Sequence, residues 1–273
     1  MTGMLVDDLR WEVRTRGTGA PLLLLHGFTG RASSWGAHAT AFARRFRLVA
    51  VDLPGHGRSG VPADPARASV ERSADDLATI LRRAHAAPAH VLGYSLGARI
   101  ALRLAISHPS AVRRLILESP SAGIADDAGR QARRASDEAL ADRLDRDGIG
   151  PFVDDWERQP VFDSYAAMPT ARRVRIHADR LRNRPAGLAA SLRGAGQGSM
   201  EPLFGRLTEV RAPTLIIAGA LDPAGHGRAA TIAEGIPGAS LATIDTAGHA
   251  PHLETPTRFR ELALAFLEED PAA

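Results

Sequence analysis

Three residues spaced along the chain could form a serine-based catalytic triad. Ser95 is the centre of the Gly-x-Ser-x-Gly motif at 93–97, which follows an apolar stretch and opens a helix-like pattern. Asp222 and His249 each follow a later apolar stretch. In such a set the histidine accepts the serine proton, and the aspartate orients the imidazole and stabilises its charged form.

Each of these residues also has an ordinary structural explanation. A serine in a glycine-rich turn often caps a helix, and Asp222 and His249 could be a helix cap and a loop residue. All three together, in the order Ser, Asp, His and each after an apolar stretch, match the arrangement of α/β-hydrolases. In that arrangement the N–H of Leu96 and the N–H of Phe28, in the His-Gly-Phe-Thr-Gly loop at 26–30, would form an oxyanion hole.

The composition excludes several other chemistries. The 273 residues contain no cysteine and no lysine, so all 34 basic residues are arginine. Disulfides, thiolate metal sites, a cysteine nucleophile and a Schiff-base lysine are therefore ruled out. His26 has no second ligand at metal-binding spacing, and we expect neither a metal nor a cofactor.

Charge and hydropathy narrow the expected partners. The net charge is only +3, and the charged residues are interspersed, so nucleic acid is not an expected partner. The apolar runs are shorter than the ~18 residues needed to cross a bilayer, and no basic segment leads into an apolar one. We expect no membrane association and a cytoplasmic location.

The elements around the candidate triad alternate between strands and helices. This alternation predicts an α/β fold with a mostly parallel sheet covered on both faces, as in the α/β-hydrolase fold. The expected strands lie at 11–16, 21–26, 47–52, 90–94, 114–118, 213–219 and 240–245. The expected core helices lie at 34–44, 70–86, 96–107 and 256–267.

The strand pattern stops in the middle of the chain. Residues 120–201 are rich in arginine and aspartate and read as helical segments broken by glycine and proline. We interpret this part as a helical cap inserted into a core formed by residues 1–119 and 202–273.

Several motifs together resemble one family within this fold. The chain is similar to MenH, the 2-succinyl-6-hydroxy-2,4-cyclohexadiene-1-carboxylate synthase family of menaquinone biosynthesis, over nearly its whole length. Arg99 and the cap sequence SLRGAGQG are the most restricted of the shared features. The motifs that carry the resemblance lie at 26–30, 52–59, 93–99, 118–121, 188–198 and 247–254.

The resemblance implies a lyase that uses a hydrolase-type triad. Its substrate would be 2-succinyl-5-enolpyruvyl-6-hydroxy-3-cyclohexene-1-carboxylate, which loses pyruvate after a ring proton is removed. Ser95, deprotonated by His249, would act as the base, and the oxyanion hole would hold charge that develops on the succinyl carbonyl. No acyl-enzyme is required by this reaction.

A small-molecule substrate with three carboxylates needs cations inside its pocket, and guanidinium groups suit carboxylates well. Arg99 lies one helical turn after Ser95 and can face the same cavity. Motif alignment with the family implies that Tyr94, Arg133, Trp156 and Arg180 bind the substrate. Arg134 and Arg182 are the alternatives to Arg133 and Arg180.

The sequence departs from the family pattern at two places, and other functions stay open. Asp222 is followed by Pro-Ala-Gly where the family has a lysine and an aromatic residue. Phe204 stands where the family more often has a tryptophan, and we expect it to be a core residue.

The alternatives to the lyase are a carboxylesterase or carbon–carbon bond hydrolase with the same triad, and a non-enzymatic receptor that binds small molecules. The sequence leaves the oligomeric state open.

Overall fold

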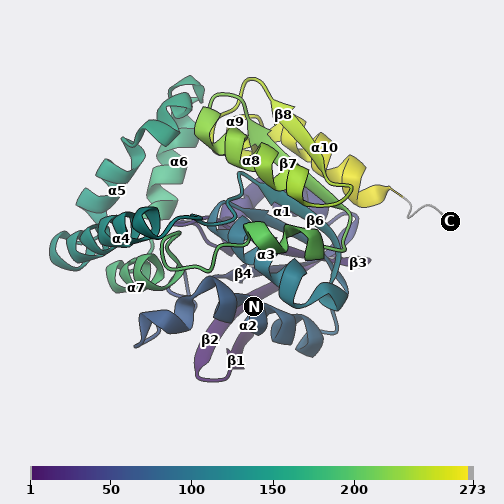
Figure 1. Cartoon of the computed structure of the whole chain (residues 1–273), viewed down its shortest axis with the longest axis horizontal. Helices are drawn as coiled ribbons and strands as arrows, with labels where there is room; N and C mark the ends of the chain where they lie inside the picture. Colours follow the sequence, from purple (N-terminus) through teal and green to yellow (C-terminus); the bar gives the residue numbers. More distant parts are fainter. Residues whose placement is uncertain (1, 270–273) are drawn as a thin grey trace.

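The computed structural model describes residues 2–269 and has an eight-stranded sheet at its centre (Figure 1). The strand order is β1-β2-β4-β3-β5-β6-β7-β8, with parallel pairing from β4 to β8. This confirms the predicted α/β-hydrolase fold class. The strands are β1 (Thr2–Val6), β2 (Leu9–Arg16), β3 (Ala20–Leu25), β4 (Phe46–Asp52), β5 (Ala89–Tyr94), β6 (Val112–Glu118), β7 (Thr214–Gly219) and β8 (Ser240–Ile244).

The central strands are buried because helices cover both faces of the sheet. In β3, Leu23 and Leu25 belong to one apolar cluster, whereas Leu22 and Leu24 belong to another. Side chains alternate between the two faces of a strand, so the four-leucine run serves both layers. The first layer includes α2 (Val70–Arg83), α3 (Leu96–Ser107) and α8 (Pro223–Gly235), and the second includes α1 (Gly36–Phe42) and α10 (Pro256–Glu268).

Helices fill the chain between β6 and β7. They gather to one side of the sheet, at the left of Figure 1, and α4, α5 and α7 share an apolar cluster of their own. The boundaries of a cap at residues 120 and 201 stay a prediction. The helices of this part are α4 (Asp127–Asp147), α5 (Ile149–Glu157), η4 (Pro160–Ala167), α6 (Thr170–Arg180) and α7 (Pro185–Ala195).

Short helices complete the fold. One of them, α9, follows the His249 loop, and the others connect longer elements. Among residues 2–269 no helix combines the length and the apolar character needed to cross a membrane. These short helices are η1 (Ala32–Trp35), η2 (Pro65–Ala68), η3 (Pro109–Ala111), η5 (Phe204–Glu209) and α9 (Pro251–Glu254).

The structure corrects four local expectations. Strand β1 was not predicted; it is an edge strand that pairs antiparallel with β2, and its Leu5 is exposed, so it lacks a buried apolar pattern. The expected helix 34–44 is divided into η1 and α1, and the expected helix 70–86 ends at Arg83. Phe204, expected in the core, is exposed because it opens η5 at the surface.

Three buried histidines outside the triad predict that acid weakens the fold. Burial lowers the pKa of His38 and His56 to about 3 and that of His90 to about 4, from 6.5. Below about pH 6.5 the unfolded chain therefore binds more protons than the folded chain. The contribution of the three neutral imidazoles to the free energy of unfolding is complete above that pH and is lost as the pH falls toward the folded pKa values. At about pH 5 we expect a loss on the order of 1–2 kcal/mol for each imidazole.

Urea unfolding at about pH 7.5 and about pH 5 checks this expectation. The free energy of unfolding should be lower at the acidic pH. Equal values at the two pH values would contradict the burial of neutral imidazoles.

Candidate active site

Ser95 lies at the sharp turn between β5 and α3. Its backbone has φ 51° and ψ −107°, an unusual conformation for a residue with a side chain. The flanking glycines allow the close approach that this turn requires. A Cβ atom on Gly93 would lie 2.3 Å from the Gly97 carbonyl oxygen, and one on Gly97 would lie 2.3 Å from the Leu25 carbonyl oxygen. The motif therefore holds the serine at the carboxyl end of the sheet.

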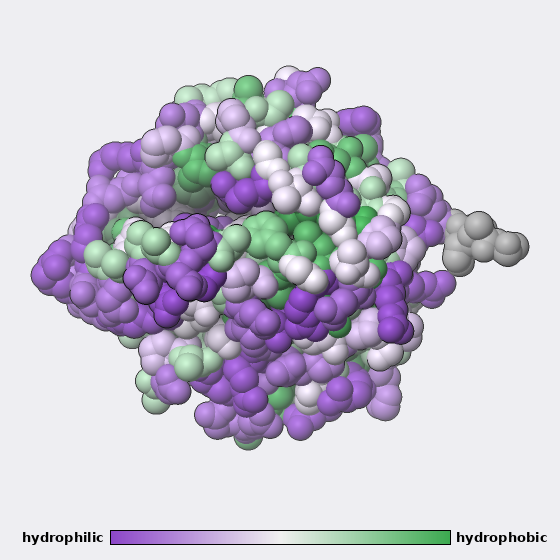
Figure 2. Space-filling model, viewed as in Figure 1, coloured by the Kyte–Doolittle hydropathy of each residue, from purple (hydrophilic) through white to green (hydrophobic). Residues whose placement is uncertain are grey.

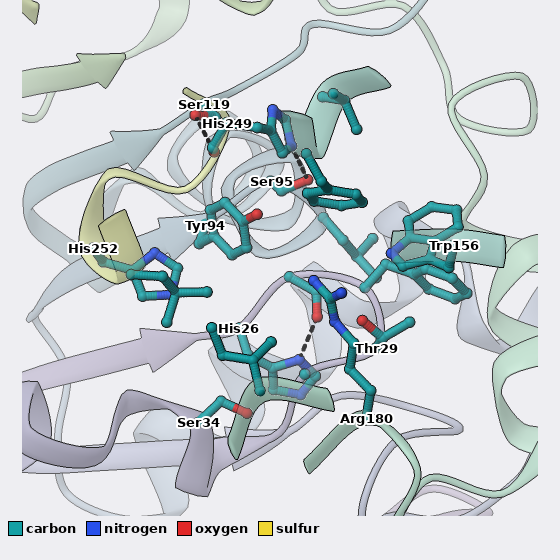
Figure 3. Close-up of a pocket in the computed structure, with 18 of the residues that line it drawn as sticks. His26, Thr29, Ser34, Tyr94, Ser95, Ser119, Trp156, Arg180, His249 and His252 are labelled. Carbon is teal, nitrogen blue, oxygen red and sulfur yellow. Dashed lines mark hydrogen bonds between the residues drawn. The ribbon is translucent and has the colours of Figure 1, made fainter. Parts of the chain in front are cut away.

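The three triad residues meet in the structure. His249 Nε2 lies 3.3 Å from Ser95 Oγ (Figure 3). On the other side of the imidazole, His249 Nδ1 lies 2.8 Å from Asp222 Oδ2. Asp222 is also the N-cap of α8, where its Oδ1 accepts the Gly225 N–H at 2.8 Å. Burial acts to raise the pKa of Asp222, but the His249 and Gly225 hydrogen bonds outweigh it and lower the pKa. Asp222 thus serves both as a helix cap and as the partner of the histidine.

Two residues that the sequence analysis did not select hold the His249 loop. Glu254 accepts the Gly248 N–H at 2.7 Å and the Ala250 N–H at 2.9 Å, so one carboxylate brackets the histidine. The Ser119 hydroxyl donates to the His249 carbonyl oxygen at 2.8 Å. The position of Glu254, five residues after the histidine, is the signal that could have identified it.

The expected oxyanion hole lies beside Ser95. Phe28 and Leu96 both line the cavity, and within residues 2–269 neither backbone N–H donates to another protein group. The loop that carries Phe28 is braced from both sides. His26 Nδ1 donates to the Gly27 carbonyl oxygen at 2.8 Å, and Asn183 Nδ2 donates to the Thr29 carbonyl oxygen at 2.7 Å. The two N–H groups are therefore available to an anion that develops near Ser95 Oγ.

A cavity of about 570 Å³ opens above the triad, where the helices between β6 and β7 meet the sheet. The space-filling view shows a largely hydrophilic surface that is hollowed beside these helices, with apolar residues visible in the hollow (Figure 2). The structure brings nearly all of the predicted site residues to this cavity. Its lining includes Phe28, Tyr94, Ser95, Leu96, Arg99, Arg133, Trp156, Arg180 and His249. Asp222 lies behind His249.

Arg99 is a buried cation of the site. Its guanidinium donates to the Ala195 carbonyl oxygen at 2.7 Å and lies 3.8 Å from the sulfur of Met200. Burial and, to a smaller extent, the charge of nearby Arg133 lower the pKa of Arg99 to about 10. The group remains charged near neutral pH and, in residues 2–269, forms no ion pair. A carboxylate of a ligand could supply that partner.

Arginines from the helices between β6 and β7 also reach the cavity. Arg180 lies with its guanidinium 5.0 Å from the ring centroid of Phe162, and Figure 3 shows it entering the pocket on the side opposite His249. Arg133 lines the cavity from α4. Arg134 and Arg182, the alternatives left open by the sequence, lie outside the cavity lining.

Aromatic side chains shape the apolar part of the site. Trp156 stacks on Phe152 at 5.7 Å and meets Phe28 edge to face at 5.1 Å. The Tyr94 ring lies 5.7 Å from that of His249, and burial raises the pKa of Tyr94, which keeps its hydroxyl neutral. The site therefore combines a base, two backbone donors, several arginines and a wall of aromatic side chains. Such a site can remove a proton from a carboxylate-bearing substrate and stabilise the resulting oxyanion.

Known proteins share both the sequence and the structure of this chain. Residues 20–256 match the family model described as alpha/beta hydrolase fold. A Bacillus subtilis (strain 168) protein provisionally named 2-succinyl-6-hydroxy-2,4-cyclohexadiene-1-carboxylate synthase is 35% identical, over 96% of this chain and 96% of its own. The structure of MenH from S. aureus has a TM-score of 0.90 and 33% identity, covering 96% of this chain and 99% of that chain.

The same sequence range is also similar to an enzyme of another class. A pimeloyl-(acyl-carrier protein) methyl ester esterase of Chromobacterium violaceum is 34% identical, over 88% of this chain and 91% of its own. Identity alone therefore does not separate the two activities, and the residues around the triad must do so.

Proposed function

The chain belongs to the MenH family of α/β-hydrolase-fold enzymes, and on that premise we propose the reaction that its site performs. It eliminates pyruvate from 2-succinyl-5-enolpyruvyl-6-hydroxy-3-cyclohexene-1-carboxylate to give 2-succinyl-6-hydroxy-2,4-cyclohexadiene-1-carboxylate, a step of menaquinone biosynthesis. The observation that carries this proposal is that Arg99, Arg133 and Arg180, which are among the arginines that line the cavity, share it with Ser95 and His249.

The triad supplies the base. His249 takes the proton of Ser95 Oγ, and the resulting alkoxide removes the ring proton next to the succinyl carbonyl. Asp222 stabilises the imidazolium that forms, through its 2.8 Å contact with Nδ1. Because no bond forms between Ser95 and the substrate, no acyl-enzyme arises.

The oxyanion hole and the arginines complete the reaction. The N–H groups of Phe28 and Leu96 hold the enolate oxygen that forms when the proton leaves. The electron pair then re-forms the carbonyl, a new ring double bond forms at the deprotonated carbon, the existing ring double bond shifts by one position, and the carbon–oxygen bond to the enolpyruvyl group breaks. The departing enolpyruvate takes up one proton, for which the His249 imidazolium is the nearby donor, and becomes pyruvate. The three guanidinium groups hold the substrate carboxylates during these steps.

Pyruvate release tests the proposal directly. The substrate is generated enzymatically, and pyruvate is followed with lactate dehydrogenase after addition of the purified protein. We expect release far above the spontaneous rate. A rate equal to the spontaneous rate would show that the chain is not this lyase.

An ester hydrolase is the second candidate, because the triad is complete and one relative is an esterase. Hydrolysis of p-nitrophenyl acetate, measured on the same preparation, separates the two. Brisk ester hydrolysis without pyruvate release would favour the esterase. If the chain is the lyase, pyruvate release should be fast and ester hydrolysis slow.

A further inference from the structure

Two arginines of the cavity each share a hydrogen bond with a carboxylate of the protein. Arg133 Nε donates to Asp137 Oδ1 at 2.9 Å, and Arg180 Nη1 donates to Glu157 Oε1 at 2.8 Å. Arg99 instead donates to a backbone carbonyl. The two cap arginines thus meet the substrate with part of each guanidinium already occupied.

Burying the Asp137 carboxylate at this position costs free energy. Its side chain is 3% exposed, its Oδ2 has no hydrogen-bond partner among residues 2–269, and burial raises its pKa. A carboxylate is expensive to bury, and here it also lines a cavity for a polyanion, whose charge it opposes. A role in arranging the neighbouring cation would offset both penalties.

The contacts restrict how each guanidinium can lie. Arg133 uses Nε for Asp137 and Nη1 for Gln197 Oε1, at 3.2 Å, and these two contacts fix the orientation of its planar group. The remaining N–H groups can then meet a substrate carboxylate in a set orientation.

Arg180 is arranged in the same manner. Glu157 holds its Nη1, and the Phe162 ring supports the face of its guanidinium. Glu157 is itself fixed, because its second oxygen lies 3.0 Å from His177 Nδ1. Two separate helices, α4 and α5, therefore provide the same kind of carboxylate support.

We propose that Asp137 and Glu157 are positioning residues that hold Arg133 and Arg180 in the orientation that receives the substrate carboxylates. The inference rests on the proposed function, because it assigns both arginines to the substrate. It adds that a pair of acids, although repelled by the substrate, strengthens its binding.

The test compares Asp137→Asn and Glu157→Gln with two matched controls. Glu138→Gln changes the next residue of α4, an exposed acid that pairs with Arg193, and Asp155→Asn changes an exposed acid of α5 that pairs with Arg143. Affinity for the reaction product is measured by calorimetry, and kcat and KM are measured from pyruvate release. We expect each test variant to raise the product Kd and the KM about tenfold and to change kcat less than about threefold. Both controls should match wild type.

A double-mutant cycle checks that the effect passes through the arginine. Asp137→Asn should weaken binding much less when Arg133 is already Gln, because the group that it positions is gone. Tighter product binding by both test variants, or the same loss with and without Arg133, would overturn the positioning role. Should Asp137→Asn lower the thermal midpoint strongly, Glu157→Gln, at a more exposed position, carries the test with the corresponding Arg180→Gln cycle.

Product binding is measured without turnover, so the two hypotheses can fail separately. Absence of pyruvate release by wild type would overturn the proposed reaction. Wild-type product affinity in both Asp137→Asn and Glu157→Gln would overturn the positioning role alone.

Discussion

Ser95→Ala should lower kcat for pyruvate release by about 10³-fold or more, with little change in substrate KM. The alanine removes the hydroxyl that takes the ring proton once His249, whose Nε2 lies 3.3 Å from Ser95 Oγ, has deprotonated it. The arginines and the oxyanion-hole N–H groups remain, so the substrate should still bind. The coupled pyruvate assay and calorimetric product binding measure the two effects separately.

The same variant distinguishes a base from a nucleophile. If Ser95 acts only as a base, mass spectrometry of wild type quenched during turnover should show the unmodified chain. A covalent adduct on Ser95 would point to acyl transfer, and a variant with kcat within about tenfold of wild type would exclude Ser95 as the base. Thermal unfolding of Ser95→Ala should resemble wild type, which confirms that the loss is chemical.

Arg99→Gln should lower kcat/KM by about 100-fold, an effect of about 2.7 kcal/mol. Arg99 is buried and meets no protein carboxylate within residues 2–269, so a substrate carboxylate would be its full counter-charge. Glutamine keeps a polar group of smaller reach but removes the charge and the planar fork. Steady-state kinetics, with the product Kd as a binding measurement, give the size of the loss.

Arg103→Gln is the matched control for this change. Arg103 lies one turn further along α3, where it pairs with Glu201 outside the cavity lining, so its kinetics should match wild type. Arg99→Lys should recover only part of the activity, since an ammonium supplies the charge without the two-pronged geometry. If Arg99→Gln and Arg103→Gln behave alike, Arg99 does not bind substrate.

Local sequence was enough to predict which serine, aspartate and histidine meet in the fold. The turn at 93–97 needs glycine on both sides of Ser95, and the apolar stretches before Asp222 and His249 place both residues at the carboxyl ends of parallel strands. These signals depend on neighbours in sequence and on the rule that such ends meet at one edge of a sheet. They predicted that the three side chains meet, and in the structure they do so through contacts of 3.3 Å and 2.8 Å.

The arginines between β6 and β7 could be selected only through the family resemblance, and the structure was needed to show which of them face the cavity. Arg133 and Arg134 are adjacent on α4, and only the rotation of that helix against α7 determines which of them faces the cavity. Successive helical residues point about 100° apart, so a small difference in packing would exchange them. The partner of Arg180 is Glu157, which lies 23 residues away on another helix, and no local pattern connects the two.

The sequence by itself therefore determined the fold class, the triad and the presence of enough arginine to bind a polycarboxylate. Tertiary structure decided which arginines line the cavity, which acids hold them, and that Glu254 brackets the histidine loop. The physical reason is the distance along the chain between the residues that determine each feature. Turn geometry and strand order are set by short segments and regular pairing, whereas the orientation of a side chain between helices depends on contacts between residues far apart in the chain.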